Sequence, residues 1–194
     1  PYEFDGSSEP DEATLSLESR GLELEPARLY IPFGEYFSHF ITGPALEFGE
    51  TRTAGGVLSY ALSDQLDLSA FLHHGQATEV DSDGPDLDWG LAVEGSPFGS
   101  VTFALSYTSD LADSNHDILE DENDEYQRRV AGLSGYGLFS RDPFEVTVEF
   151  VLSLNSFEEF PEQRDQPRAW NVVLAYFPRE ALGLRSPRLA TSQL

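Results

Sequence analysis

The chain has 194 residues and a formal net charge of −24 at pH 7, from 35 acidic residues against 11 basic ones that are all Arg. A polyanion of this strength repels phosphate backbones, which excludes nucleic acids as partners. The absence of cysteine excludes a disulfide framework and a thiolate metal site.

Stretches in which apolar and polar residues alternate recur along the chain and predict β-strands. In chain order they cover residues 12–18, 27–31, 51–62, 66–74, 87–94, 101–108, 126–139, 144–155 and 168–177. The clearest alternation starts at Phe144, where apolar side chains face one way and Glu145 and Glu149 face the other. Val151 is the one residue that breaks this pattern. No segment between the strands has a convincing helical period.

The connections between these strands are of two kinds. Short turns at 64–65, 95–99 and 140–143 alternate with long polar loops at 32–50, 75–86, 110–125 and 156–167. This asymmetry is typical of outer-membrane barrels, and strands of roughly 9 to 12 residues suit a tilted membrane crossing. We therefore predict an all-β fold in one domain, residues 1–194: an antiparallel up-and-down transmembrane β-barrel with about nine or more strands. A soluble jelly roll or lipocalin-like barrel is the alternative.

If the apolar side of the strands meets lipid, the other side lines the barrel interior. The titratable residues predicted to line it are Glu12, Glu18, Asp67, His73, Asp88, Glu94, Glu145 and Glu149. Unpaired carboxylates cannot lie in hydrocarbon or in a dry core, so they favour a water-filled pore that prefers cations. In the alternative, a plugged interior, some of them pair with Arg52, Arg128, Arg129 or Arg168.

The loop before residue 88 has carboxylates at every second or third position around a glycine, as calcium loops do. A weak Ca²⁺ site would use Asp81, Asp83, Asp86 and Asp88. Pro85 and the missing distal Glu depart from the EF-hand, so a solvated external loop is the competing interpretation. The four histidines show no convergent third ligand, and no nucleophile motif is present. We predict no enzymatic activity and no other cofactor.

Two neighbouring segments carry a family resemblance. They are Arg28-Leu-Tyr30-Ile-Pro32-Phe33-Gly34 and Leu46-Glu47-Phe-Gly49-Glu50-Thr51-Arg52. Together they resemble the LbtU-type siderophore porins, which are outer-membrane barrels of Gram-negative bacteria. The resemblance implies an outer-membrane location, contact with lipid and uptake of a small solute such as a siderophore. Members of that family are longer, and the chain has no Met, so we expect a fragment that lacks the leader and further strands.

Three functional hypotheses follow. The first is a porin or uptake channel with an acidic interior. The second is a structural or docking barrel whose acidic external loops bind an envelope partner or a second copy of the chain. The third is a soluble β-domain. The acidic excess with Arg in place of Lys is also typical of a salt-adapted organism.

Overall fold

A computed structural model of the chain describes residues 13–14, 17–19, 22–34, 52–75, 78–79, 87–112, 125–158 and 165–177. Its regular elements are β1 (Ala13–Thr14), β2 (Leu17–Ser19), β3 (Leu22–Tyr30), β4 (Arg52–Ser63), β5 (Leu66–His74), β6 (Thr78–Glu79), β7 (Leu87–Phe98), β8 (Val101–Thr108), β9 (Glu125–Tyr126), β10 (Gly132–Arg141), β11 (Phe144–Ser153) and β12 (Arg168–Tyr176). The described residues contain no helix long and apolar enough to cross a membrane. The fold is all-β, as the sequence predicts.

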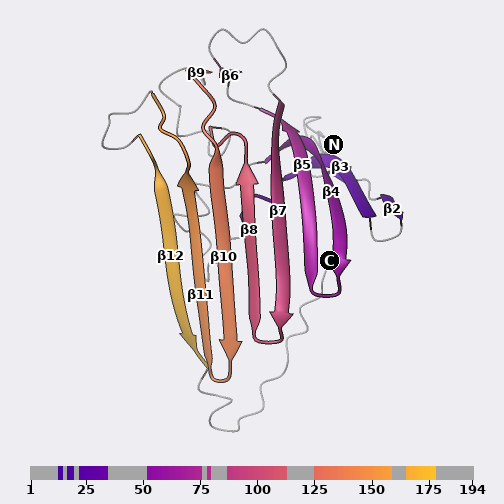
Figure 1. Ribbon diagram of the computed structural model, residues 1–194, viewed down its shortest axis with the longest axis vertical. Coiled ribbons are helices and arrows are strands. Elements are labelled where there is room, and N and C mark those ends of the chain that lie inside the picture. The colour runs from indigo at the N-terminus through magenta and orange to yellow at the C-terminus, as the bar shows by residue number, and fades with distance from the viewer. Residues whose placement is uncertain are drawn as a thin grey trace, which may run out of the picture.

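Ten strands form one sheet with the order β1-β3-β4-β5-β7-β8-β10-β11-β12, and β2 pairs with β3 beside β1. All its pairings are antiparallel, and its eight long strands run up and down in chain order (Figure 1). The short β6 and β9 form a separate parallel pair. β6 lies in a predicted loop, and β9 lies at the boundary between a predicted loop and the strand predicted to begin at residue 126. Within the described part of the chain the outermost strands, β1 and β12, do not pair with each other. The sheet is thus compatible with an incomplete barrel.

The two ends of the sheet are connected differently. Two-residue turns at 64–65, 99–100 and 142–143 join β4 to β5, β7 to β8 and β10 to β11 at the same end (Figure 1). In the first of these turns the Gln65 backbone N–H donates to Ser63 Oγ over 3.3 Å. The strand ends that lead into the longer connections lie at the opposite end, which we call the loop end. The gathering of the short turns at one end agrees with the predicted barrel topology.

β3 is longer than predicted. It begins at Leu22 and continues through Pro26, which lies between the predicted strands 12–18 and 27–31. β2 pairs with residues 22–24 and β1 with residues 27–28, so neither neighbour on that side pairs with Pro26. On its other side Pro26 stays in register with Gly56 of β4.

Two other strand boundaries differ from those that the sequence predicts. β7 extends to Phe98 through an irregular register between Gly95 and Phe98, where the sequence predicts a turn. β10 begins at Gly132 rather than at residue 126. The reason is that the Val130 carbonyl accepts from the Leu111 N–H over 2.8 Å, so this backbone joins a loop segment before it joins the sheet.

Candidate functional site

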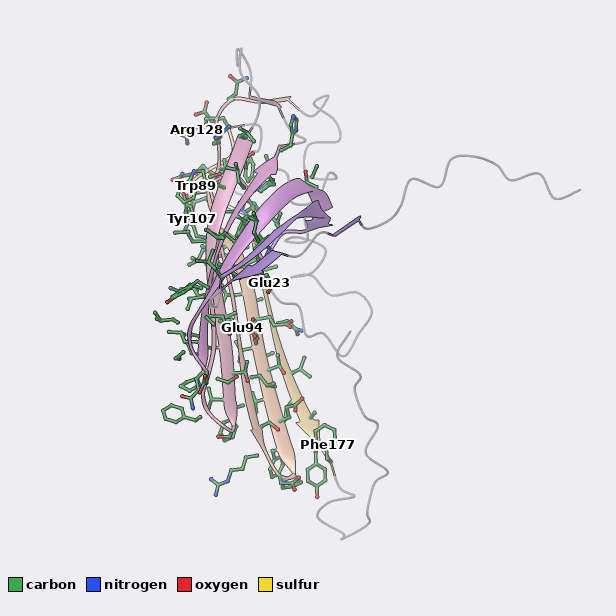
Figure 2. The ribbon with its side chains drawn as sticks, turned by 90° about the vertical axis from the view of Figure 1, so that its right-hand side faces the viewer. Glu23, Trp89, Glu94, Tyr107, Arg128 and Phe177 are labelled. Carbon is green, nitrogen blue, oxygen red and sulfur yellow. The ribbon has the colours of Figure 1, made fainter. Side chains whose placement is uncertain are left out.

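One face of the sheet is apolar because side chains alternate along each strand and the register keeps like faces together. One row crosses seven strands through Leu24, Leu58, Ala70, Leu91, Tyr107, Leu133 and Leu152. Large side chains on this face are exposed, with Trp170 at 71% and Leu174 at 69%. Figure 2 shows Trp89 and Tyr107 on the convex side of the curved sheet. We call this convex side the apolar face.

Aromatic pairs lie at both ends of the apolar face. The ring centroids of Trp89 and Tyr107 are 5.3 Å apart near the loop end. Those of Phe144 and Tyr176 are 5.2 Å apart near the turn end. On β10, the partners of Tyr107 and Phe144 are the two ends of the span 133–141. A strand of about 9 to 11 residues crosses a bilayer when tilted, so the two aromatic pairs have the spacing of the two membrane interfaces.

The concave side of the sheet is polar, and we call it the polar face. Its central row carries small side chains and hydroxyl groups, of which Ser59 and Ser69 lie 3.0 Å apart between their Oγ atoms. Ser106 and Ser134 are direct cross-strand partners further along the same row, and both are buried. The sheet thus has an exposed apolar side and a more polar concave side.

The residues predicted to line a pore differ in exposure. Glu12 lies outside the described residues, and Glu18 is in β2, where its side chain is not described. Those described alternate onto the polar face: Asp67, His73, Asp88, Glu94, Glu145 and Glu149. Among them Asp67 and Glu94 are exposed and Glu145 is half-buried. His73, Asp88 and Glu149 are buried, so they do not lie open to a wide pore in this structure.

A polar belt crosses the polar face at mid-height. Its members follow the register Asp67, Glu94, Ala104, Tyr136, Glu149 and Asn171 from β5 to β12. The Tyr136 hydroxyl donates to Glu94 Oε1 over 3.3 Å, and Asn171 Nδ2 donates to Glu149 Oε2 over 3.2 Å. The belt therefore joins Glu94 to a tyrosine two strands away and Glu149 to an asparagine on the neighbouring strand.

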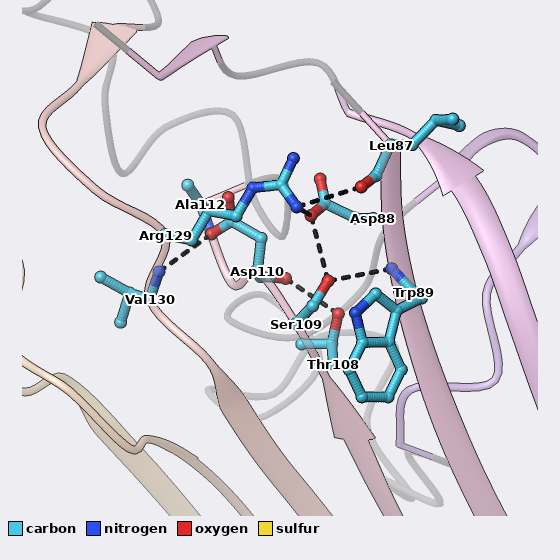
Figure 3. Close-up of polar contacts among 9 residues, drawn as sticks. All are labelled: Leu87, Asp88, Trp89, Thr108, Ser109, Asp110, Ala112, Arg129 and Val130. Atoms are coloured by element: carbon cyan, nitrogen blue, oxygen red, sulfur yellow. Dashed lines mark hydrogen bonds and ion pairs between the residues drawn. The ribbon is translucent and has the colours of Figure 1, made fainter. Parts of the chain in front are cut away.

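At the loop end, Asp88 is held in a dense network (Figure 3). Its Oδ1 atom lies 3.4 Å from Arg129 Nη1 and accepts from Ser109 Oγ over 3.0 Å. Arg129 also donates to the Leu87 carbonyl over 3.1 Å. Ser109 completes the link by accepting from the Trp89 N–H over 2.9 Å and donating its own N–H to the Trp89 carbonyl over 2.7 Å. This network fastens β7 to the segments after β8 and before β10.

Asp110 organises the segment that follows β8 (Figure 3). Its Oδ1 atom accepts from the Ala112 N–H over 2.9 Å and from the Val130 N–H over 3.4 Å. Its carbonyl accepts from the Thr108 hydroxyl over 2.9 Å. A buried aspartate thus satisfies backbone donors that a sheet ladder does not reach.

A buried apolar cluster covers the polar face at the loop end. Its members are Ile31, Phe33, Val57, Phe71, Leu111, Ala112, Val130, Val151 and Phe157. Gly132 makes room for it, since a Cβ there would come within 3.0 Å of Phe33 and 2.8 Å of Leu111. The Gly34 N–H donates to Ser106 Oγ over 2.9 Å, which fixes the segment after β3 against β8. We call residues 31–34 the crossing segment.

Comparison with known proteins finds a distant relative. The chain is similar to a UPF0422 protein of Coxiella burnetii (strain RSA 493 / Nine Mile phase I), at 28% identity over 163 residues. The match covers 77% of this chain and 35% of that protein, so the chain spans about a third of its relative's length. No family model matches the chain, and no solved structure matches it. The relative's name states no activity.

The predicted calcium ligands lie mostly beyond the described residues. Asp81, Asp83 and Asp86 fall there, while the Oδ1 atom of Asp88 is engaged by Arg129 and Ser109. The described residues hold no group of three or more His, Asp or Glu side chains that could bind a metal ion. The calcium loop therefore stays a prediction.

The residues that carry the family resemblance are only partly described. Glu47, Gly49, Glu50 and Thr51 fall outside the described residues, and the side chains of Arg28, Tyr30 and Arg52 are not described. The backbone pairs Tyr30 with Arg52. Pro32, Phe33 and Gly34 form the crossing segment, with Phe33 buried.

Sequence reasoning missed several residues of the site. Tyr136 and Asn171 complete the belt but carry no charge, so a search for titratable residues passes over them. Asp110 lies in a predicted loop. Of the bases named for a plugged interior, Arg129 pairs with Asp88 as that alternative predicts, whereas Arg128 pairs with the exposed Glu158 at 3.3 Å.

Proposed function

We propose that the chain forms part of the wall of an outer-membrane β-barrel in a Gram-negative bacterium. In this proposal the barrel is a porin or uptake channel that passes a small solute through an acid-lined interior. The observation that carries the proposal is the inverted polarity of the sheet, with large apolar side chains exposed on the convex face and carboxylates on the concave face. A barrel that closes with this curvature turns its apolar side to lipid.

Further observations support a membrane setting. The aromatic pairs Trp89–Tyr107 and Phe144–Tyr176 lie near opposite ends of the strands, as interfacial girdles do. The short turns gather at one end of the sheet, and the strand ends that lead into the longer connections lie at the other. Exposed carboxylates at Asp67 and Glu94 would give the interior a negative potential that favours cations. The resemblance to LbtU-type porins adds a siderophore as a candidate solute.

The decisive experiment is planar-bilayer recording of the purified full-length protein. We expect discrete conductance steps, and a reversal potential in a KCl gradient that shows cation preference. The protein should also partition into detergent micelles and migrate differently on gels before and after heating, as closed barrels do. Absence of conductance from a correctly folded, heat-modifiable barrel would remove the channel function, and anion preference would remove the acid-lined pore.

A structural or docking barrel is the second candidate, and a different observation favours it. The apolar cluster and the Asp88–Arg129 pair bury part of the polar face at the loop end, which suits a closed interior. Such a barrel would give no conductance and would co-purify with an envelope partner or as a homo-oligomer. A soluble β-domain would instead purify as a monodisperse species without detergent.

A further inference from the structure

Glu149 is a buried carboxylate in the middle of β11, on the polar face. It is 2% exposed, and its Oε2 atom accepts a hydrogen bond from Asn171 Nδ2. Its Oε1 atom is also buried and has no hydrogen-bond partner in the described part of the chain. Asp88, which is equally buried, has an Arg beside it, whereas no ion pair is found for Glu149 among the described residues.

The surroundings of Glu149 supply neutral oxygen atoms. Tyr136 is its direct cross-strand partner on β10 and is buried. Ser134 is the diagonal neighbour on the same face, a separation of about 7–8 Å that a Glu side chain can bridge. The Ser134 Oγ atom is likewise buried without a hydrogen-bond partner among the described residues. Two unsatisfied oxygen atoms therefore belong to neighbouring positions on one face.

An ionised carboxylate in this setting is costly, because burial removes its hydration and the described residues place no opposite charge beside it. The free energy cost falls if a cation enters and coordinates or donates to the unsatisfied oxygens. Among the described residues the cross-strand partners of Glu149, Tyr136 and Asn171, are neutral, and the next carboxylate of the belt, Glu94, already accepts from the Tyr136 hydroxyl. One buried carboxylate matches a monovalent cationic group better than Ca²⁺, which takes six to eight oxygen ligands, often from several carboxylates.

We propose that Glu149, with Ser134, Tyr136 and Asn171, forms a binding site for a monovalent cationic group in the barrel wall. The group is either a primary ammonium of an organic solute or an alkali metal ion. An ammonium has three N–H donors and can satisfy Glu149 Oε1 and a serine hydroxyl together. This inference deepens the proposed channel function and rests on it for the accessibility of the site from the interior.

The test measures cation binding separately from conductance. The unfolding midpoint of the detergent-solubilised full-length protein is compared in methylammonium chloride, KCl and N-methylglucamine chloride at equal ionic strength. N-methylglucamine is the bulkiest of the three cations and serves as the reference. We expect methylammonium or K⁺ to raise the midpoint by about 3 °C, as expected when a ligand binds only the folded state. A response to methylammonium alone identifies the ammonium group, and a response to K⁺ identifies the metal ion.

Variants make the test specific. Glu149→Gln keeps the shape and the Asn171 hydrogen bond and should abolish the cation effect. Asp67→Asn removes the same charge from an exposed position on the same face and should leave the effect intact. Ser134→Ala should weaken the effect of the cation on the unfolding midpoint. This variant replaces Glu149→Gln in the test if Glu149→Gln does not fold. An equal effect in Glu149→Gln or Ser134→Ala and wild type, or no effect of either cation, would overturn the proposal.

Recording separates this inference from the channel itself. In a conducting protein, Glu149→Gln should reduce cation preference and weaken block by methylammonium at least tenfold, while Asp67→Asn should change the block less than twofold. A wild-type protein that binds cations without conducting would retain the site and remove the channel. If the protein conducts but Glu149→Gln changes neither its cation preference nor its block by methylammonium, the channel function is retained and the Glu149 binding site is removed.

Discussion

Gly34 and Ser106 lie 72 positions apart in the sequence, and the Gly34 N–H donates to the Ser106 hydroxyl over 2.9 Å. The two residues belong to different strand regions, since Gly34 follows β3 and Ser106 lies in β8, with β4, β5 and β7 between these strands in the sheet. The crossing segment therefore lies over the polar face. It brings Phe33 into the apolar cluster that covers this face at the loop end.

Ser106→Ala should release the crossing segment. The substitution removes one hydrogen bond, worth about 1 kcal/mol, and leaves a backbone donor to find another partner. Hydrogen exchange of the Gly34 amide should become about fivefold faster, whereas the overall fold should be retained. Ser59→Ala is the matched control, because it removes a serine hydroxyl bond from the same face without touching Gly34. Equal exchange in Ser106→Ala and wild type would show that packing of Phe33 alone holds the segment.

Arg129→Met should be far more destabilising than Arg128→Met. Arg129 neutralises Asp88, whose side chain is 1% exposed, so its loss leaves a buried carboxylate without a cation. We expect the free energy of unfolding to fall by about 3 kcal/mol. Arg128 pairs with Glu158 between side chains that are 53% and 55% exposed, and its loss should cost less than about 1 kcal/mol. Urea unfolding in detergent measures both changes.

A double variant checks the cause of that difference. Asp88→Asn combined with Arg129→Met removes both charges, so a large part of the lost stability should return. If the double variant is as unstable as Arg129→Met, packing of the arginine stem rather than an uncompensated charge explains the loss.

The sheet could be predicted from the sequence because period-two alternation is a local property of each strand. The side of β11 that carries Glu145 and Glu149 was read from the chain alone, and those residues do share the polar face. Residues that depart from the alternation of apolar and polar side chains mark the part of the polar face that is covered. Val151 and Phe71 are apolar residues on the polar face, and both pack in the buried cluster at the loop end.

The polar contacts could not be predicted, because they join residues far apart in sequence. Nothing near Asp88 in the chain indicates Arg129, which reaches it from 41 positions away. Tyr136 and Glu94 meet through the register of two pairings, β7 with β8 and β8 with β10. The exposure of these side chains could not be predicted either. Asp67 and Glu149 are both acidic residues in alternating strands, but Asp67 is exposed and Glu149 is buried.

Gly90→Ala should destabilise the sheet, whereas Gly137→Ala should not. A Cβ at residue 90 would collide with the Phe71 ring and the Tyr107 carbonyl oxygen, and a backbone atom cannot move aside easily. A Cβ at residue 137 meets no atom within 4 Å. We expect a loss of about 1–3 kcal/mol for Gly90→Ala and a neutral or slightly stabilising effect for Gly137→Ala. The urea unfolding midpoints of the two variants measure this, and similar midpoints would contradict the described packing.

Val172→Arg and Val173→Arg should distinguish the side of the sheet that faces lipid in the proposed barrel from the side that faces the interior. The two residues are adjacent in β12, and Val172 points to the apolar face, where it is 54% exposed, while Val173 points to the polar face. An arginine near the middle of a lipid-facing strand costs about 2–4 kcal/mol, whereas an arginine that faces water inside a barrel costs much less. Folding into lipid vesicles, followed by urea titration, should therefore fail or weaken for Val172→Arg and stay close to wild type for Val173→Arg. If Val173→Arg were the more damaging variant, the concave side would be the packed core, and the barrel would be a soluble one.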